Sequence, residues 1–280
     1  MSVAAERLPL PRRRLHALGF VRRQVLTVYS LLMFGYLLLP IAVVILFSFN
    51  NPSGRFNYTW QGFTLKYWQN WDGVPGLRAA MVLSLEIALV ASLFATTLGT
   101  LIALALVRYG FRGRGATNLL IFLPLSTPEI VLGASLLTLF LNLSFVTFGF
   151  LTILIAHIMF CISFAVVTVK ARLIGFDRHL EEAAMDLGAN EWTTFRKVTL
   201  PLIAPAILAA LLLCFAISID DFVVTYFNAG PRITFPLFVW GSARVGAPPQ
   251  VNVIGTAIFV VAVTAMLFNV VFQRRREVHA

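Results

Sequence analysis

The sequence predicts an all-α polytopic membrane protein with six transmembrane helices, and three observations lead to this fold class. Hydrophobic residues make up 59% of the 280 residues and charged residues 12%, a balance that a water-soluble domain does not have. Six apolar runs are each long enough to cross about 30 Å of hydrocarbon, which takes about 20 helical residues. Lys and Arg gather in alternate segments between these runs, as expected for loops on alternate sides of a membrane.

The six runs follow one another with mostly short connections. The first is too long for a signal-peptide core and no small-residue cleavage site follows it, so we expect it to be retained as a signal anchor. Arginines or polar loops bound the first and second runs, and the linker between the third and the fourth is too short and apolar to be a domain. The predicted spans cover residues 25–49, 82–107, 116–140, 147–169, 203–227 and 253–272.

The distribution of positive charge predicts that both termini are cytoplasmic. With the N-terminus inside, only five of the 22 Lys and Arg residues lie on the outer side. We therefore predict a basic cytoplasmic tail at 1–24, a membrane domain at 25–272 and a second basic tail at 273–280. This orientation signal, with contact to anionic lipid, accounts for the net charge of +10, so the charge does not indicate nucleic acid as a partner.

Small residues and prolines inside the spans predict how the helices pack. Small side chains recur at every fourth position of the second span and form one stripe, which is typical of a face where helix backbones approach closely. These residues are Ala91, Ala95, Gly99 and Ala103. Prolines interrupt the first and third spans, at Pro40, Pro124 and Pro128, and the carbonyls left unpaired beside them favour a cavity over a lipid-facing surface.

Other polar and sulfur-containing residues have structural interpretations. The longest outer loop, 50–77, is rich in Trp and Tyr, so we expect an interfacial belt or a short helix on the outer leaflet, with contact to an external partner as the alternative. His157 is alone in an apolar run and is interpreted as buried and hydrogen-bonded. Cys161 and Cys214 lack companions at metal spacing, so we expect small buried side chains and no metal site.

A polar segment at residues 181–188 lies between the fourth and fifth spans, on the predicted cytoplasmic side. It begins with strong helix formers, and Gly188 supplies a C-terminal stop. A second helical turn at 192–197 precedes Pro201. We predict a compact knob of two short helices that docks on a partner protein. Its shallow apolar surface and its charge come from Ala183, Ala184, Leu187 and Glu182.

The spacing in this segment resembles the EAA loop of ABC-importer permeases. Glu182-Ala183-Ala184 is followed after three intervening residues by Gly188 and, after nine more intervening residues, by Val198-Thr199-Leu200-Pro201, with Val198 where the family most often has Ile. The resemblance implies a type I ABC importer permease fold, in which the loop 178–201 couples transport to an ATPase. The residues that it assigns to coupling are Glu181, Glu182, Ala183, Ala184, Gly188, Leu200 and Pro201.

The same resemblance implies partners and a place in the cell. The partners are a pair of ATPase subunits, a second related permease subunit and an extracytoplasmic substrate-binding protein, assembled in the bacterial inner membrane with the first span wrapped around a neighbouring subunit. The sequence has no phosphate-binding glycine loop with Lys and Ser or Thr, so the ATPase subunits would bind ATP and Mg. We expect no cofactor in this chain and no enzymatic activity of its own.

Acidic residues in or near the membrane are candidates for a transport pathway. An ionisable side chain at membrane depth costs at least ~2.5 kcal/mol, so it tends to face a cavity, a counter-charge or a cargo. No Lys or Arg lies at similar depth, so Glu129, Asp220 and Asp221 either titrate, reach water or meet a cationic cargo. Glu86 is closer to the outer headgroups, where we expect it to be solvated and paired with Arg78.

Two segments resemble the spermidine/putrescine branch of these permeases. They are Ser218-Ile219-Asp220-Asp221-Phe222-Val223-Val224-Thr225-Tyr226-Phe227, followed by Gly230-Pro231 and Phe235-Pro236, and Pro128-Glu129-Ile130-Val131-Leu132-Gly133. The resemblance implies a polyamine cargo, a flexible polycation that separated carboxylates and aromatic ring faces would suit. The predicted substrate pathway comprises Asp220, Asp221, Glu129, Tyr226 and Phe222.

The residues leave other functions open. The nearest alternative cargo is another small solute, such as a different cationic amine, thiamine or an iron complex. An ion-coupled carrier or channel would use Glu129 and Asp220 as ion sites, but it has no use for the segment 181–188. A membrane-embedded enzyme is a weaker alternative, because the sequence lacks clustered His, Cys or Ser/His residues.

Overall fold

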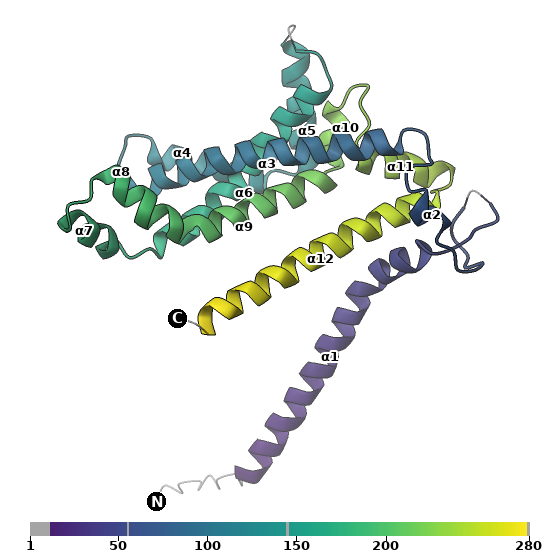
Figure 1. The fold of residues 1–280 in the computed structure, drawn as a ribbon, viewed down its shortest axis with the longest axis horizontal. Coiled ribbons are helices and arrows are strands. Elements are labelled where there is room, and N and C mark those ends of the chain that lie inside the picture. The colour runs from purple at the N-terminus through teal and green to yellow at the C-terminus, as the bar shows by residue number, and fades with distance from the viewer. Residues whose placement is uncertain (1–11, 55, 144–145, 279–280) are drawn as a thin grey trace, which may run out of the picture. The chain divides into compact units, whose positions relative to one another are not determined.

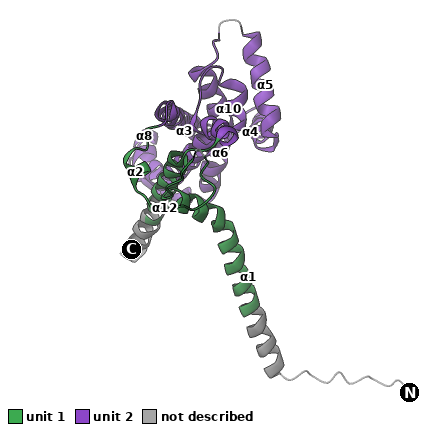
Figure 2. Ribbon diagram, turned by 90° about the vertical axis from the view of Figure 1, so that its right-hand side faces the viewer, with its two compact units in different colours: residues 1–73, 246–280 green, residues 74–245 purple. Residues whose placement is uncertain are grey.

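The computed structural model describes residues 12–54, 56–143 and 146–278, and the named elements in these ranges are all helices. They form two compact units, one containing α1, α2 and α12 and the other containing α3 to α11 (Figure 2). The all-α membrane fold that the sequence predicts is confirmed. The helices of the first unit are α1 (Arg12–Phe47), α2 (Lys66–Gln69) and α12 (Pro249–Val278).

The second unit contains the two segments that the sequence singles out. Its helices are α3 (Leu77–Arg108), α4 (Arg114–Ser126), α5 (Glu129–Asn142), α6 (Phe150–Ile174), α7 (His179–Asp186), α8 (Glu191–Thr194), the π-helical turn η1 (Phe195–Thr199), α9 (Leu200–Asp220), α10 (Val223–Asn228) and α11 (Phe235–Val245).

Among the described residues, four helices are long and apolar enough to cross a membrane: Gln24–Phe47, Leu77–Arg108, Phe150–Ile174 and Glu191–Asp220. The pair α4 and α5 makes a fifth if its two bent halves count as one span. The described apolar part of α12, Pro249–Thr264, is shorter than a span. The predicted count of six spans therefore stays a prediction, as do the cytoplasmic tails at 1–24 and 273–280, whose side chains lie almost entirely outside the described residues.

The third predicted span is not one continuous helix. α4 and α5 are bent by 110° at residues 127–128. Pro128 has no N–H to donate and disfavours helical backbone at the residue before it, and Thr127 is accordingly extended, with ψ at 130°. The Thr127 hydroxyl donates to the carbonyl of Leu123 at 2.7 Å, which satisfies one acceptor at the break. Pro124, by contrast, lies inside α4 without ending it.

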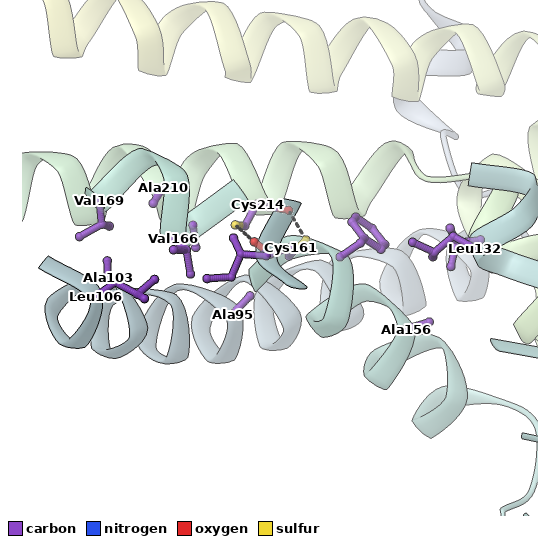
Figure 3. Packing of buried hydrophobic residues seen from close by; sticks show 14 of the residues in the cluster. Ala95, Ala103, Leu106, Leu132, Ala156, Cys161, Val166, Val169, Ala210 and Cys214 are labelled. Atoms are coloured by element: carbon purple, nitrogen blue, oxygen red, sulfur yellow. Dashed lines mark hydrogen bonds between the residues drawn. The ribbon is translucent and has the colours of Figure 1, made fainter. Parts of the chain in front are cut away.

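The core of the second unit is the packing of α3, α6 and α9 (Figure 1). The predicted small-residue stripe of α3 lies in it, and Ala91, Ala95 and Ala103 are fully buried. A Cβ added to Gly99 would stand only 2.6 Å from the Cβ of Ala165 in α6, so only glycine allows this approach. The stripe is confirmed as a packing face within this chain, as Figure 3 shows for three of the core helices.

Two free cysteines mark the contact between α6 and α9. Cys161 and Cys214 are fully buried, and each thiol faces the backbone carbonyl of the other residue, at 3.6 and 3.3 Å (Figure 3). The interpretation as small buried side chains is confirmed. Since α9 runs antiparallel to α6, its C-terminal end lies beside the beginning of α6.

The first unit contains an ordered loop rather than a plain interfacial helix. α2 has four residues, and the segment before it folds around Asn50, whose amide donates to Asn57 Oδ1 and to the carbonyl of Thr59, both at 2.7 Å. Phe49 stacks on Phe63 and Trp68, with ring centroids 5.5 and 5.3 Å apart. Buried polar side chains and stacked rings therefore hold this loop together.

The arrangement of the second unit places its two candidate sites at opposite ends. α7 and α8 lie at one end of the α3–α6–α9 core, and α10 and α11 lie at the other, with α5 beside α10 (Figure 1). The connections after α3 and after α6 share the first end, as the charge distribution predicts for segments on one side of a membrane.

Candidate functional site

The predicted helix of the polar segment is present as α7. It ends at Asp186, two residues before Gly188, which has a left-handed φ of 87°. The amides of Gly188 and Ala189 donate to the carbonyls of Met185 and Ala184 at 2.9 and 3.1 Å. This closure of the last turn by glycine is the expected helix stop. Asn190 then caps α8, because its side-chain oxygen accepts from the amide of Thr193 at 2.8 Å.

The two adjacent glutamates of α7 face different surroundings. One carboxylate oxygen of Glu181 accepts hydrogen bonds from Arg108 Nη2 in α3 and from the Thr199 hydroxyl in η1. The side chain of Glu182 is 61% exposed and lies 3.1 Å from His179 Nδ1 in its own helix. Glu181 therefore attaches α7 to the membrane helices, whereas Glu182 is available to a partner.

A second contact strengthens this attachment. Arg178 Nη2 donates to the carbonyl of Val107, in the last turn of α3, at 3.1 Å, so α7 is held at both Val107 and Arg108. The sequence identified Arg108 only as a charge that sets orientation. It lies 73 residues from Glu181, and no local spacing signals the pair.

Several apolar side chains of the loop are exposed. Leu187 is 91% exposed, and Ala183 is exposed while Ala184 is half-buried, so the structure places part of the expected apolar surface outside. Large apolar side chains that the sequence did not assign to this surface are also exposed: Leu180, Met185 and Trp192. Such an exposed apolar group is typical of a protein contact.

The sequence suggested a second short helix that ends before Pro201. In the structure this helix instead continues into α9, so that one helix covers Glu191–Asp220. Pro201 cannot donate a hydrogen bond to the preceding turn. The helix accommodates it through η1, in which the amide of Leu200 reaches back to the carbonyl of Phe195. Leu200 and Pro201 thus lie at the first turn of α9.

At the other end of the core, the fifth predicted span is broken. α9 ends at Asp220, and Asp221 is extended, with ψ at 121°. The expectation of a continuous helix from 203 to 227 was wrong because Asp221 starts a new helix: its carboxylate accepts from the amides of Val224 and Thr225 in α10, at 3.4 and 2.8 Å. Asp and Asn favour this local capping over the helix interior.

His157 lies against this break and is buried and hydrogen-bonded, as the sequence predicts. Its Nδ1 is 2.7 Å from the Ser218 hydroxyl, and its Nε2 is 2.9 Å from the Thr225 hydroxyl and 3.3 Å from Asp221 Oδ2. The partners come from α9, the break and α10, so no spacing in the sequence indicates them.

The remaining predicted pathway residues gather around the two helix breaks. Glu129 is in the first turn of α5, directly after the break at Pro128, and both Glu129 and Asp220 are exposed. Glu129 begins α5 and Asp220 ends α9, directly before α10. α5 and α10 approach closely here, since a Cβ on Gly133 would stand 2.8 Å from the Phe227 ring.

A group of aromatic rings begins directly after the break at Asp221. The ring of Phe222 is 5.7 Å from that of Tyr226 and 5.2 Å from that of Trp240 in α11. Arg244 lies over the Trp240 ring at 5.1 Å. Trp240 was not predicted for this site, because an aromatic residue in a membrane protein is usually lipid-facing or interfacial. Glu86, on α3, is exposed, and among the described residues no three His, Cys, Asp or Glu side chains cluster as a metal site would require.

Known proteins with similar sequences are transport permeases. Residues 95–278 match the family model for "Binding-protein-dependent transport system inner membrane component". The chain is 41% identical over 242 residues to the spermidine/putrescine transport system permease protein PotC of Escherichia coli (strain K12), covering 86% of this chain and 90% of PotC. It is 39% identical over 238 residues to the putrescine transport system permease protein PotI of the same strain, covering 82% and 84%.

Solved structures with the same fold belong to ABC transporters. A bacterial transporter involved in the import of the polysaccharide alginate matches with a TM-score of 0.61 at 18% identity, covering 95% of this chain and 99% of that chain. The MetNI methionine transporter matches with a TM-score of 0.56 at 17% identity, covering 69% and 92%. The chain therefore belongs to the binding-protein-dependent transport system inner membrane components, which are multi-pass proteins of the bacterial inner membrane.

Proposed function

We propose that this chain is the membrane-spanning subunit of an ATP-driven ABC importer of polyamines such as spermidine and putrescine. The observation that carries the proposal is the meeting of two broken helices. α5 packs against α10, and an exposed carboxylate lies at each break, Glu129 at the start of α5 and Asp220 at the end of α9. A group of three aromatic rings begins directly after the second break. A polyamine carries separated positive charges on an apolar chain. Carboxylates suit its ammonium groups, and the faces of Phe222, Tyr226 and Trp240 suit both the cations and the methylenes.

The loop at the other end of the core would couple this site to ATP. We propose that α7 docks on an ATPase subunit through Glu182 and the exposed apolar side chains around Leu187. Gly188, Leu200 and Pro201 shape the loop, and Glu181 connects it to α3 and α9. ATP and Mg would be bound by the ATPase pair, whose closure would move the helices between inward- and outward-facing states. The chain itself would perform no chemistry.

The proposed assembly has further members. A second related permease subunit would complete the pathway, and an extracytoplasmic binding protein would deliver the polyamine. One matched alginate transporter structure is described as a complex with a substrate-bound periplasmic protein, which supports such a delivery step. The binding at the acidic site must be weak, because the cargo has to leave it.

The experiment is uptake of radiolabelled spermidine and putrescine by the complete transporter, co-purified with its partner subunits and reconstituted in vesicles. We expect uptake that requires ATP and that falls at least about tenfold in Asp220→Asn or Glu129→Gln, since losing one charged hydrogen bond costs about 1.5–3 kcal/mol. Glu86→Gln, which removes an exposed acid elsewhere on α3, is the matched control and should keep normal uptake.

Other results would overturn the proposal. Uptake of thiamine or an iron complex in place of polyamines would assign a different cargo. Uptake by the purified chain without ATP would instead indicate an ion-coupled carrier.

A further inference from the structure

The two adjacent carboxylates at the break have different environments. The Asp221 side chain is 7% exposed, whereas Asp220 is exposed. Asp221 Oδ2 accepts from the amide and the hydroxyl of Thr225, at 2.8 and 2.7 Å, and lies 3.3 Å from His157 Nε2. A cargo ammonium could reach this oxygen only by displacing donors that the protein already supplies.

The hydrogen-bond directions around His157 follow from simple chemistry. An ionised carboxylate only accepts, so the single hydroxyl proton of Thr225 is donated to Asp221. The Thr225 oxygen must then accept from His157, which places a proton on Nε2. His157 Nδ1 meets the Ser218 hydroxyl at 2.7 Å. One ring on α6 thus bonds to the end of α9 through Ser218 and to α10 through Thr225.

These hydrogen bonds lie at the break between α9 and α10. A helix break leaves amides and carbonyls without helical partners, and in a membrane protein such groups must be satisfied by the protein itself. Asp221 satisfies the first amides of α10, and His157 fixes Asp221 and Thr225 from the side. The orientation of α10 decides where Phe222 and Tyr226 lie relative to Trp240.

We propose that Asp221 and His157 are a buried positioning pair that holds the break of the fifth span, and that Asp220, not Asp221, is the carboxylate that contacts cargo. This inference rests on the proposed polyamine import for its transport readout. The proposal divides the acidic pair into one residue that binds and one that orients. Both roles need a carboxylate, so the sequence alone does not reveal which of the two adjacent Asp residues has which role.

The first test compares uptake of spermidine, a trication, with that of putrescine, a dication, by the reconstituted transporter. Asp220→Asn should lower spermidine uptake at least about fivefold more than putrescine uptake, because a direct contact acts on charge. Asp221→Asn should lower the maximal rate for both amines by the same factor. The double variant Asp221→Asn/His157→Leu should lose no more than the worse single variant, since one interaction is removed in each case. A change of the amine ratio in Asp221→Asn, or multiplying losses in the double variant, would overturn the proposal.

The second test uses the geometry of the ring. The amide nitrogen of Gln reaches about as far as His Nε2, and that of Asn about as far as Nδ1, so His157→Gln can still donate to Thr225 whereas His157→Asn and His157→Leu cannot. We expect His157→Gln to retain uptake within about threefold and His157→Asn and His157→Leu to lose at least about tenfold. Equal losses in all three would contradict the assigned role of Nε2.

A third readout needs no cargo. In the complete transporter, the exposed Tyr226 is replaced by Cys and its labelling rate by a water-soluble maleimide is measured, since both native thiols are fully buried. His157→Leu should change this rate at least about fivefold and His157→Gln should not. If polyamine uptake fails while this pattern holds, the proposed cargo is wrong and the positioning role stands. Unchanged labelling in His157→Leu would overturn the positioning role whatever the cargo.

Discussion

Glu181 and Arg108 form an ion pair across 73 residues of sequence, and it joins the loop between α6 and α9 to the end of α3. The neighbouring Glu182 points outward. Two adjacent glutamates of one motif therefore differ, because Glu181 attaches the loop to the membrane helices whereas Glu182 is exposed.

Substitutions at these two positions should separate coupling from assembly. Glu182→Lys is expected to weaken retention of the ATPase subunits during co-purification, because it reverses an exposed charge in the proposed contact. Glu181→Gln should retain them but lower uptake per ATP hydrolysed about tenfold, since a hydrogen bond to a charged group is worth about 1.5–3 kcal/mol. The measurement is ATPase activity and uptake in the same vesicles. Normal coupling in Glu181→Gln would contradict the attachment role.

The turn at Gly188 should be sensitive to any side chain. Its φ of 87° costs a non-glycine residue about 1–2 kcal/mol, so Gly188→Asp is expected to leave a folded subunit with reduced ATPase coupling. Gly188→Ala adds no charge and should show the effect of the backbone strain alone. Gly188→Asn should reduce coupling less, because Asn tolerates left-handed backbone. Unchanged transport by Gly188→Asp in reconstituted vesicles would show that the turn geometry is not needed.

Packing between α3 and α6 predicts a stability effect far from both sites. A methyl group at position 99 would clash with Ala165 at 2.6 Å, so Gly99→Ala should lower the stability of the purified subunit by about 1–3 kcal/mol. Adding Ala165→Gly to the Gly99→Ala variant should recover part of this loss of stability. Gly35→Ala is the control, because nothing lies within 4 Å of a Cβ there. Thermal unfolding in detergent gives the stability of the original protein, the two single variants and the double variant. Equal effects of Gly99→Ala and Gly35→Ala on stability would contradict the close packing.

Trp240 should contribute to cargo affinity. Its ring packs on Phe222 at 5.2 Å, and a cation–π contact is worth about 0.5–2 kcal/mol. Trp240→Leu is therefore expected to raise the KM for spermidine by about threefold or more, whereas Trp240→Phe keeps a ring and should remain nearer to the original value. Initial uptake rates over a range of spermidine concentrations provide the test. A KM unaffected by Trp240→Leu would remove this residue from the site.

The sequence was informative where structure depends on local chemistry. Apolar runs predicted the helices, small residues at every fourth position predicted the packing face of α3, and Gly188 predicted where α7 ends. It was least informative where a polar side chain decides between continuing and breaking a helix. Asp221 lies in an apolar run that is typical of one continuous span, but the helix breaks there, and the Asp221 carboxylate accepts hydrogen bonds from the amide and the hydroxyl of Thr225.

Contacts over long separations explain the other omissions. Arg108 and Glu181 meet only because α3 and α6 pack side by side, and Trp240 reaches Phe222 only because α11 folds back on the core. Hydropathy does not encode such pairs. For the same reason the sequence grouped Asp220 with Asp221, although their side chains face different environments.

The continuous helix from Glu191 to Asp220 has a mechanical consequence. Its 30 residues correspond to a rod of about 45 Å at about 1.5 Å per residue, with the loop at one end and the acidic break at the other. A single helix can tilt as one body, without a series of side-chain movements along its length. A small tilt imposed at Glu191 would therefore move Asp220 by a distance proportional to the length of the helix. The π-helical turn near its base, like Pro205 inside α9, interrupts the regular hydrogen bonding of this rod and is therefore a place where its angle can adjust.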